Sequence, residues 1–219
     1  MKPRERRRLK RLHAFERAAW ESGAHYVCGV DEVGRGPLAG PVVACAVVID
    51  KPLELEHLND SKVVTMLRRQ ELEAVIRSQA VCVSLGWADV EEIDRINILQ
   101  ASRLAMARAL AGLSVPPCRV FVDAVSIPGC PYPQESIIDG DAKSAAIAAA
   151  SIVAKVARDA HMALLDALFP EYGFAQHKGY ATLEHLHVLA RLGPCAHHRR
   201  SFAPVIAPPF DFVFDRGAP

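Results

Sequence analysis

The sequence predicts an α/β protein in which helices flank a mixed β-sheet and a helical extension follows at the C-terminus. Short, strongly apolar segments alternate with longer segments of helical periodicity, which is the pattern of an α/β layer. At 219 residues, the chain is long enough for one domain with a sizeable core. Several apolar segments end in acidic residues, and sheets of this class place their functional sites at such strand ends.

Apolar segments rich in β-branched residues mark the strands. Tyr26–Val33 and Val42–Ile49 flank the loop GRGPLAGP, so we expect them to be antiparallel neighbours. Two further strands are expected at Val81–Trp87 and Arg119–Asp123. Glu135–Ile138 is either a fifth strand or an extended lead into the next helix.

Helical periodicity marks the segments between and after these strands. Thr65 is placed to cap the first of the predicted helices. The longest helix begins almost entirely with Ala, Ser and Ile, and its small residues let a helix backbone lie close to a sheet. Its Lys155 and Asp159 are expected to pair on the outer side. The predicted helices are Met66–Ser78, Val90–Leu113, Ala142–Phe169 and Thr182–Arg191.

The N-terminus is far more basic than the rest of the chain. Residues 1–20 carry eight Lys or Arg and two Glu, whereas the other 199 residues carry 18 basic and 23 acidic side chains. We therefore expect a basic arm at 1–24, a folded domain at 25–205 and a flexible tail at 206–219. The arm suits contact with a polyanion, although a solvated helical lead-in is an open alternative.

Nothing in the sequence predicts export or membrane insertion. A secretory signal needs an apolar stretch, and His13, Glu16 and Arg17 interrupt the one available. The longest apolar runs, Pro41–Ile49 and Ala145–Ala150, are far shorter than the roughly 20 residues that span a bilayer. We expect a cytoplasmic monomer with no membrane contact.

The cysteines agree with a reducing compartment. None of the six forms a CxxC pair, which argues against a zinc site. Four lie inside or beside apolar segments and are expected to be buried, reduced thiols: Cys28, Cys45, Cys82 and Cys118.

Carboxylates at the ends of apolar segments are the main functional signal. Asp31 and Glu32 end the first strand, Asp123 ends the fourth, and Asp141 opens the long Ala-rich helix. Acids gathered at one rim of a sheet repel one another unless cations lie among them. Oxygen ligands of this kind select Mg²⁺ or Mn²⁺, and a pair of such ions supports phosphodiester hydrolysis. Surface acids with no shared site are the alternative.

Three other motifs fit a nucleic-acid ligand, although each is weak alone. The glycines of Gly34-Arg35-Gly36 let the backbone approach sugar hydroxyls or phosphates. Asp60-Ser61-Lys62 precedes a helix, where phosphates bind readily. The segments HKGY (177–180) and HHRRSF (197–202) form a basic and aromatic cluster. We expect the histidines to pack or cap rather than to bind metal.

The sequence resembles the type 2 ribonucleases H, the ribonuclease HII group. The resemblance covers about residues 25–205 and is carried in order by DEVGRGPLAGPVV, NDSK, NILQASRLAM, FVDA, GDAKSAAIAAASIVAKVARD, YGFAQHKGYAT and HRRSF. It implies a ribonuclease H-like fold with a C-terminal helical extension. It also implies cleavage of the RNA strand of RNA–DNA hybrids and nicking of duplex DNA 5′ of an embedded ribonucleotide, which leaves 3′-hydroxyl and 5′-phosphate ends.

The resemblance also assigns roles to particular residues. The family's metal-binding acids fall on Asp31, Glu32, Asp123 and Asp141. Its loop that senses the 2′-hydroxyl falls on Gly34, Arg35 and Gly36, its phosphate-contacting lysine on Lys62, and its sugar-stacking tyrosine on Tyr180.

The sequence departs from the family pattern at three positions. Asp139 and Val63 stand where lysines are common, so positive charge is lost near the site, and Ala124 stands where a glycine is common. The reaction type is unaffected by these changes, but substrate affinity and metal preference are open.

Other readings remain to be tested. A type 3 ribonuclease H shares the catalytic motifs but has an additional N-terminal domain. A non-catalytic nucleic-acid-binding module and a small-molecule phosphatase with two metals are alternatives from other classes. In the tail, PPFDFVF (208–214) is a candidate docking motif for a replication clamp. A tail packed loosely on the core is the explanation that we favour.

Overall fold

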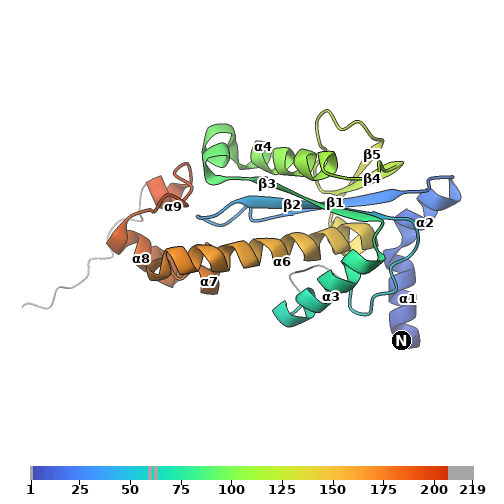
Figure 1. Cartoon of the computed structure of the whole chain (residues 1–219), viewed down its shortest axis with the longest axis horizontal. Coiled ribbons are helices and arrows are strands. Elements are labelled where there is room, and N and C mark those ends of the chain that lie inside the picture. The colour runs from blue at the N-terminus through green and yellow to red at the C-terminus, as the bar shows by residue number, and fades with distance from the viewer. Residues whose placement is uncertain (1, 59–60, 62–63, 207–219) are drawn as a thin grey trace, which may run out of the picture.

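The computed structural model describes residues 2–58, 61 and 64–206 (Figure 1). These residues contain a mixed five-stranded sheet with the order β3–β2–β1–β4–β5. The pairs β1–β2 and β2–β3 are antiparallel, and β1–β4 and β4–β5 are parallel. The strands are β1 (Val27–Val33), β2 (Val42–Ile49), β3 (Cys82–Ala88), β4 (Arg119–Asp123) and β5 (Gln134–Ile137). Each predicted strand is confirmed to within one residue at either end, and so is the expected antiparallel pair.

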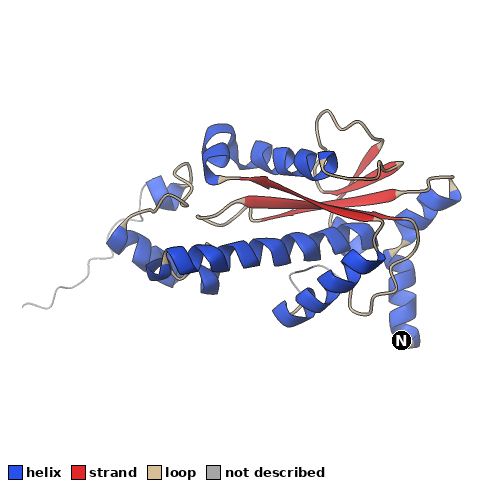
Figure 2. Ribbon diagram, in the orientation of Figure 1, coloured by secondary structure: helices blue, strands red, loops and turns tan. Residues whose placement is uncertain are grey.

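Helices cover both faces of the sheet (Figure 2). Helix α4 (Val90–Ala111) packs on one face, against β2 and β3. Helix α6 (Ala145–Leu168) runs under the other face, against β1 and β2, and α3 (Met66–Gln79) packs against α6. Thr65 caps α3 by accepting a hydrogen bond from the Arg68 amide, as predicted.

Two glycines allow these helices to approach the sheet closely. A Cβ atom added to Gly29 of β1 would lie 2.1 Å from the carbonyl carbon of Ala146 in α6. A Cβ atom added to Gly86 of β3 would lie 2.0 Å from the carbonyl oxygen of Ala105 in α4. Each contact therefore requires glycine for steric reasons, and the Ala-rich start of α6 supplies the matching small residues.

Two predicted helices are interrupted. The segment expected at Ala142–Phe169 is divided at Ser144, which is extended, into α5 (Gly140–Lys143) and α6. The Ser144 hydroxyl accepts from the Ile147 amide and so caps α6. Helix α4 is broken at Asn97, whose φ is 65°. The Asn97 side chain accepts from the amides of Leu99 and Gln100 and restarts the helix there.

Two expectations about exposure were wrong. Lys155 and Asp159 do pair, but their side chains are only 17% and 9% exposed, because Arg69 of α3 lies 3.5 Å from the same carboxylate. The pair therefore joins α6 to α3 instead of lying on an outer surface. Cys118 is exposed in the loop before β4 and Cys82 is only half-buried, whereas Cys28 and Cys45 are buried in the sheet as expected.

The basic N-terminal segment forms two helices that are anchored to the body. These are α1 (Pro3–Leu12) and α2 (Ala14–Glu21). Leu9 and Leu12 belong to the main core, and the buried His13 accepts a hydrogen bond from the Leu53 amide at 2.9 Å. The buried carboxylate of Glu16 accepts from the Ser144 hydroxyl and the Ala146 amide, so it caps α6 from a distant part of the sequence.

The C-terminal extension continues from the far end of α6. It consists of a 3₁₀ turn (Pro170–Tyr172), α7 (Phe174–His177), α8 (Leu183–Leu192) and α9 (Ala203–Ile206). The clamp motif suggested at 208–214 lies outside the described residues. Across the described part of the chain, every helix is too short or too polar to traverse a bilayer.

We predict that Gly29→Ala lowers the free energy of unfolding. A methyl group cannot fit 2.1 Å from a backbone atom of α6, so the helix and the sheet must move apart. Overpacking typically costs about 1–3 kcal/mol, and each kcal/mol corresponds to about 2–4 °C in Tm for a chain of this size. Differential scanning calorimetry measures the shift. Gly36→Ala is the matched control, because its Cβ would meet only an ordinary contact at 3.8 Å. A Gly29→Ala protein whose Tm equals that of the wild type would contradict this packing.

Candidate active site

The sheet brings Asp31 and Asp123 to the same edge. The parallel register pairs Val30 with Val122, so the next residue of each strand is one of these aspartates. Asp31 is buried, and one of its carboxylate oxygens accepts from the Glu32 amide at 2.8 Å. Asp123 accepts from the Gly140 amide at 2.7 Å, which ties the start of α5 to the end of β4. Asp141 is the next residue after Gly140, within α5, and its side chain is buried.

Burial and mutual repulsion act on these acids. Burial raises the pKa of Asp31 well above its usual range, and the charges of Glu32 and Asp123 add to the rise. A hydrogen bond with Ser151 of α6 opposes it. Burial also raises the pKa of Glu32, while Arg35, whose guanidinium lies 3.1 Å away, works against the rise. Asp31, Glu32 and Asp123 are therefore close enough to interact electrostatically.

The donor set fits hard divalent cations. It consists of carboxylate oxygens, and Glu32 Oε2 is buried with no hydrogen-bond partner among the described residues. The acids do not form a closed cage, because in the described part of the chain no three His, Cys, Asp or Glu side chains are close enough to hold a metal ion. Carboxylates that repel one another are expected to draw together around a cation.

The glycine-rich loop and Tyr180 lie side by side. A Cβ atom added to Gly36 would be 3.8 Å from Cε1 of Tyr180, whose side chain is 42% exposed. The Leu38 amide donates to the Gly179 carbonyl at 2.8 Å and holds the two segments together. The structure thus joins two motifs that are far apart in the sequence. Lys62 lies outside the described residues, and its neighbour Ser61 is buried against Ser151.

Two buried arginines position this loop, and sequence reasoning missed both. Arg199 donates to the carbonyl oxygens of Gly34, Arg35 and Gly40 at 2.5 to 3.0 Å. Arg158 of α6 donates to the carbonyl oxygens of Pro41, Ala39 and Lys178 at 3.0 to 3.1 Å. The expectation that the basic and aromatic cluster HHRRSF (197–202) faces a nucleic-acid ligand is wrong for Arg199, because its side chain is fully buried.

These guanidiniums are held by carbonyl groups. Burial lowers the pKa of Arg158 to about 10 and that of Arg199 to about 9, where the charge of Arg158 adds to the effect. Both remain cationic at neutral pH. A guanidinium presents several donors in one plane, which suits it to bind carbonyls that converge from different segments. The paired arginines therefore fix the backbone of the glycine-rich loop.

The histidines of the extension pack against the backbone of Tyr180 and against one another, in agreement with the expectation that they pack. Nδ1 of the buried His185 lies 2.9 Å from the Tyr180 carbonyl oxygen. Its Nε2 lies 3.0 Å from Nε2 of His198, which is also buried. Burial lowers the pKa of His198 to about 4, so this pair is neutral at physiological pH.

The departures from the family pattern have different structural consequences. Asp139 is exposed and lies 3.7 Å from Lys143 of α5, so part of its charge is balanced locally. Ala124 adopts a φ of 53°, a conformation that favours glycine. An alanine at this position is therefore strained beside Asp123. Val63 lies outside the described residues.

We predict that Arg199→Lys loosens the glycine-rich loop. An ammonium group cannot reach all the carbonyl oxygens that Arg199 binds, and an unpaired buried polar group costs about 1–3 kcal/mol. Hydrogen exchange of the amides at 34–40 should accelerate, and Tm should fall. Arg200→Lys is the matched control, because the Arg200 side chain is exposed and its binding to Asp94 uses the backbone amide. Equal exchange in the two variants would show that Arg199 does not hold the loop.

Comparison with known proteins agrees with this geometry. The model of the family described as Ribonuclease HII matches residues 28–205. A protein of Moorella thermoacetica named ribonuclease HII is 53% identical over 198 residues, which cover 90% of this chain and 96% of the relative.

Solved structures show the same fold. Ribonuclease H2 from Pyrococcus horikoshii OT3 superposes with a TM-score of 0.69 at 25% identity, covering 83% of this chain and 95% of that one. Ribonuclease HII of Archaeoglobus fulgidus, solved as a complex with PCNA, gives 0.67 at 25% identity, covering 79% and 91%. The family match sets aside the type 3 alternative. The chain belongs to the ribonuclease HII family and is a metal-dependent endoribonuclease.

Proposed function

We propose that this enzyme cuts the RNA strand of RNA–DNA hybrids and nicks duplex DNA on the 5′ side of an embedded ribonucleotide. The products would carry 3′-hydroxyl and 5′-phosphate ends. The observation that carries the proposal is the meeting of Asp31 and Asp123 on neighbouring parallel strands, with Glu32 and the start of α5 beside them. The glycine-rich loop follows this site directly in the sequence.

Asp31, Glu32, Asp123 and Asp141 would hold two Mg²⁺ or Mn²⁺ ions. Bound there, the ions would supply an activated water and stabilise the charge on the phosphate and the leaving oxygen. The residues of the chain would place the phosphodiester. Glu32 pairs with Arg35 at 3.1 Å, so a substrate at this edge of the sheet would meet both the acids and the loop. Lys62, the expected phosphate contact, belongs to this proposal as well.

The loop and Tyr180 would choose the position of the cut. Backbone groups of Gly34, Arg35 and Gly36 can reach a ribose hydroxyl because two of the three residues have no side chain to keep it away. The exposed ring of Tyr180 lies next to Gly36 and would stack on the following sugar. A 2′-hydroxyl on that sugar would crowd the ring, so the pair favours ribose followed by deoxyribose.

We propose further that residues 25–205 form the catalytic domain and act in the cytoplasm. The family match over residues 28–205 supports the boundaries, and six free cysteines support a reducing compartment. The monomeric state stays a prediction. The complex of the archaeal relative with PCNA is a property of that protein, and a clamp contact through 208–214 stays a prediction here.

We predict that Asp31→Asn and Asp123→Asn reduce cleavage to background. Each change removes a ligand charge while keeping the shape of the side chain. Cleavage of duplex DNA that contains one ribonucleotide, with and without Mg²⁺, measures the loss. The rise in Tm that Mg²⁺ gives the wild type should also disappear, because a ligand stabilises only the state that binds it. Asp139→Asn is the control: because the Asp139 side chain is exposed, this variant should cleave like the wild type. Normal turnover in either site variant would exclude the acids as metal ligands.

We predict that Tyr180→Ala loses activity selectively. Stacking of an aromatic ring is worth about 1–3 kcal/mol. A sugar contact at the lower end of that range corresponds to roughly tenfold in rate. The loss should appear on a single ribonucleotide in DNA and be smaller on an all-RNA strand paired with DNA. Tyr180→Phe should retain most of the activity because it keeps the ring. Equal losses on both substrates would show that Tyr180 only supports the fold.

A further inference from the structure

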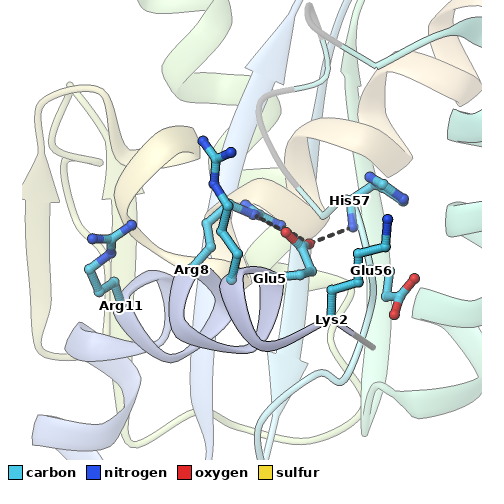
Figure 3. Close-up of a pocket in the computed structure, with 7 residues that line it drawn as sticks. Lys2, Glu5, Arg8, Arg11, Glu56 and His57 are labelled. Carbon is cyan, nitrogen blue, oxygen red and sulfur yellow. Dashed lines mark hydrogen bonds and ion pairs between the residues drawn. The ribbon is translucent and has the colours of Figure 1, made fainter.

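The basic side chains of α1 line two separate hollows, on different faces of the helix. Arg4, Arg8 and Arg11 are spaced by four and three residues, which places them on one face. Together with Lys2, Glu5, Glu56 and His57 they line a hollow of about 510 Å³ (Figure 3). Figure 3 shows Arg11, Arg8, Glu5 and Lys2 in succession along α1, with His57 and Glu56 opposite them.

This hollow continues towards the active site. A second hollow of about 340 Å³ is lined by Arg8 and Arg11 again and by Ala142 and Lys143 of α5. The shared arginines make the two hollows one surface, and α1 packs beside α5. Lys143 is two residues from Asp141. The two hollows together therefore extend from the N-terminal helix to α5, the helix that carries Asp141. We call this surface the basic groove: Lys2, Arg4, Arg8, Arg11 and Lys143.

Two of the five cations of the groove are paired among the described residues: Arg8 is balanced by Glu5, and Lys143 lies 3.7 Å from Asp139. The Glu5 carboxylate accepts from Arg8 at 2.7 and 2.9 Å and from the His57 amide at 2.9 Å, so it balances Arg8 alone. That contact with Arg8 lowers the pKa of Glu5 to about 2. Among the described residues, no ion pair involves Lys2, Arg4 or Arg11.

The groove is held rigidly in place relative to the site. Leu9 and Leu12 anchor α1 in the core, and His13 bridges the Leu9 carbonyl and the Leu53 amide. Glu16 then ties the segment to the start of α6, next to α5. A basic tail that only kept the protein soluble would need none of these buried contacts.

We propose that the basic groove binds the phosphate backbone of the duplex that occupies the active site, several base pairs from the cut. The proposal rests on the proposed function in taking nucleic acid as the partner. Continuity with the site and the excess of positive charge favour this partner. A lipid surface is disfavoured, since within the described residues no large exposed apolar side chain belongs to α1. A ten-residue helix is about 15 Å long, which corresponds to about four base pairs of duplex.

The test compares Arg4→Gln/Arg11→Gln with Arg6→Gln/Lys10→Gln. Both double variants remove two charges from the same helix, but Arg6 and Lys10 line a different hollow, beside Pro52 and Leu53. Arg8 is left intact because it holds Glu5. Binding is measured by fluorescence anisotropy on all-DNA duplexes of about 8 and about 20 base pairs over a range of salt concentrations, with circular dichroism to establish that each variant is folded. Each lost phosphate contact lowers the slope of log affinity against log salt by about 0.9.

On the longer duplex, the salt slope of Arg4→Gln/Arg11→Gln should fall by about 1.8, because two phosphate contacts are lost. The slope of the control, Arg6→Gln/Lys10→Gln, should stay close to that of the wild type. On the short duplex, the two variants should have the same slope. Equal slopes for the two variants on the longer duplex would overturn the proposal. All-DNA duplexes are not substrates, so this result does not depend on cleavage. Failure of the wild type to cut a ribonucleotide-containing duplex would instead refute the proposed function.

Discussion

The direct contact between β1 and α6 at Gly29 is the constraint on which the rest of the molecule depends. With no side chain between strand and helix, the position of one determines the position of the other. The same strand ends in Asp31, and the same helix brings Ser151 to that aspartate. Further along, Arg158 of α6 reaches the loop that follows β1. A helix buried along most of its length thus connects the acids, the loop and the C-terminal extension.

The buried arginines show how a glycine-rich sequence is held in one backbone conformation. A loop with several glycines has high conformational entropy, and a ligand would otherwise have to order it on binding. Arg199 and Arg158 order it in advance by binding carbonyl groups from both sides of Leu38. Because Arg158 also binds the Lys178 carbonyl, the loop and the segment before Tyr180 share one anchor.

The residue pattern predicted the sheet well, and it singled out Asp31, Glu32 and Asp123, which lie close together, because both follow from local rules. Strands show as apolar runs, and an acid at the end of such a run is unusual enough to indicate a site. The functions of Arg199, Arg158 and Glu16 could not be predicted in this way. In sequence, Arg199 looks like any other member of a basic cluster, and only the fold reveals that carbonyl groups surround it. Asn97 gave no sign that its side chain would interrupt α4, because asparagine is tolerated within helices as well as at their ends.

The cap that Glu16 provides for α6 also bears on the order in which the chain folds. Glu16 and Ala146 are 130 residues apart, so α2 emerges from the ribosome long before its partner exists. Contacts of such sequence separation form late, because the intervening chain must first be ordered. Until α6 has been synthesised, α2 therefore lacks the contacts of Glu16 with Ser144 and Ala146, and the start of α6 lacks its cap until α2 docks. Docking of the first two helices therefore depends on α6, whose N-terminus is capped by a residue from the very start of the chain.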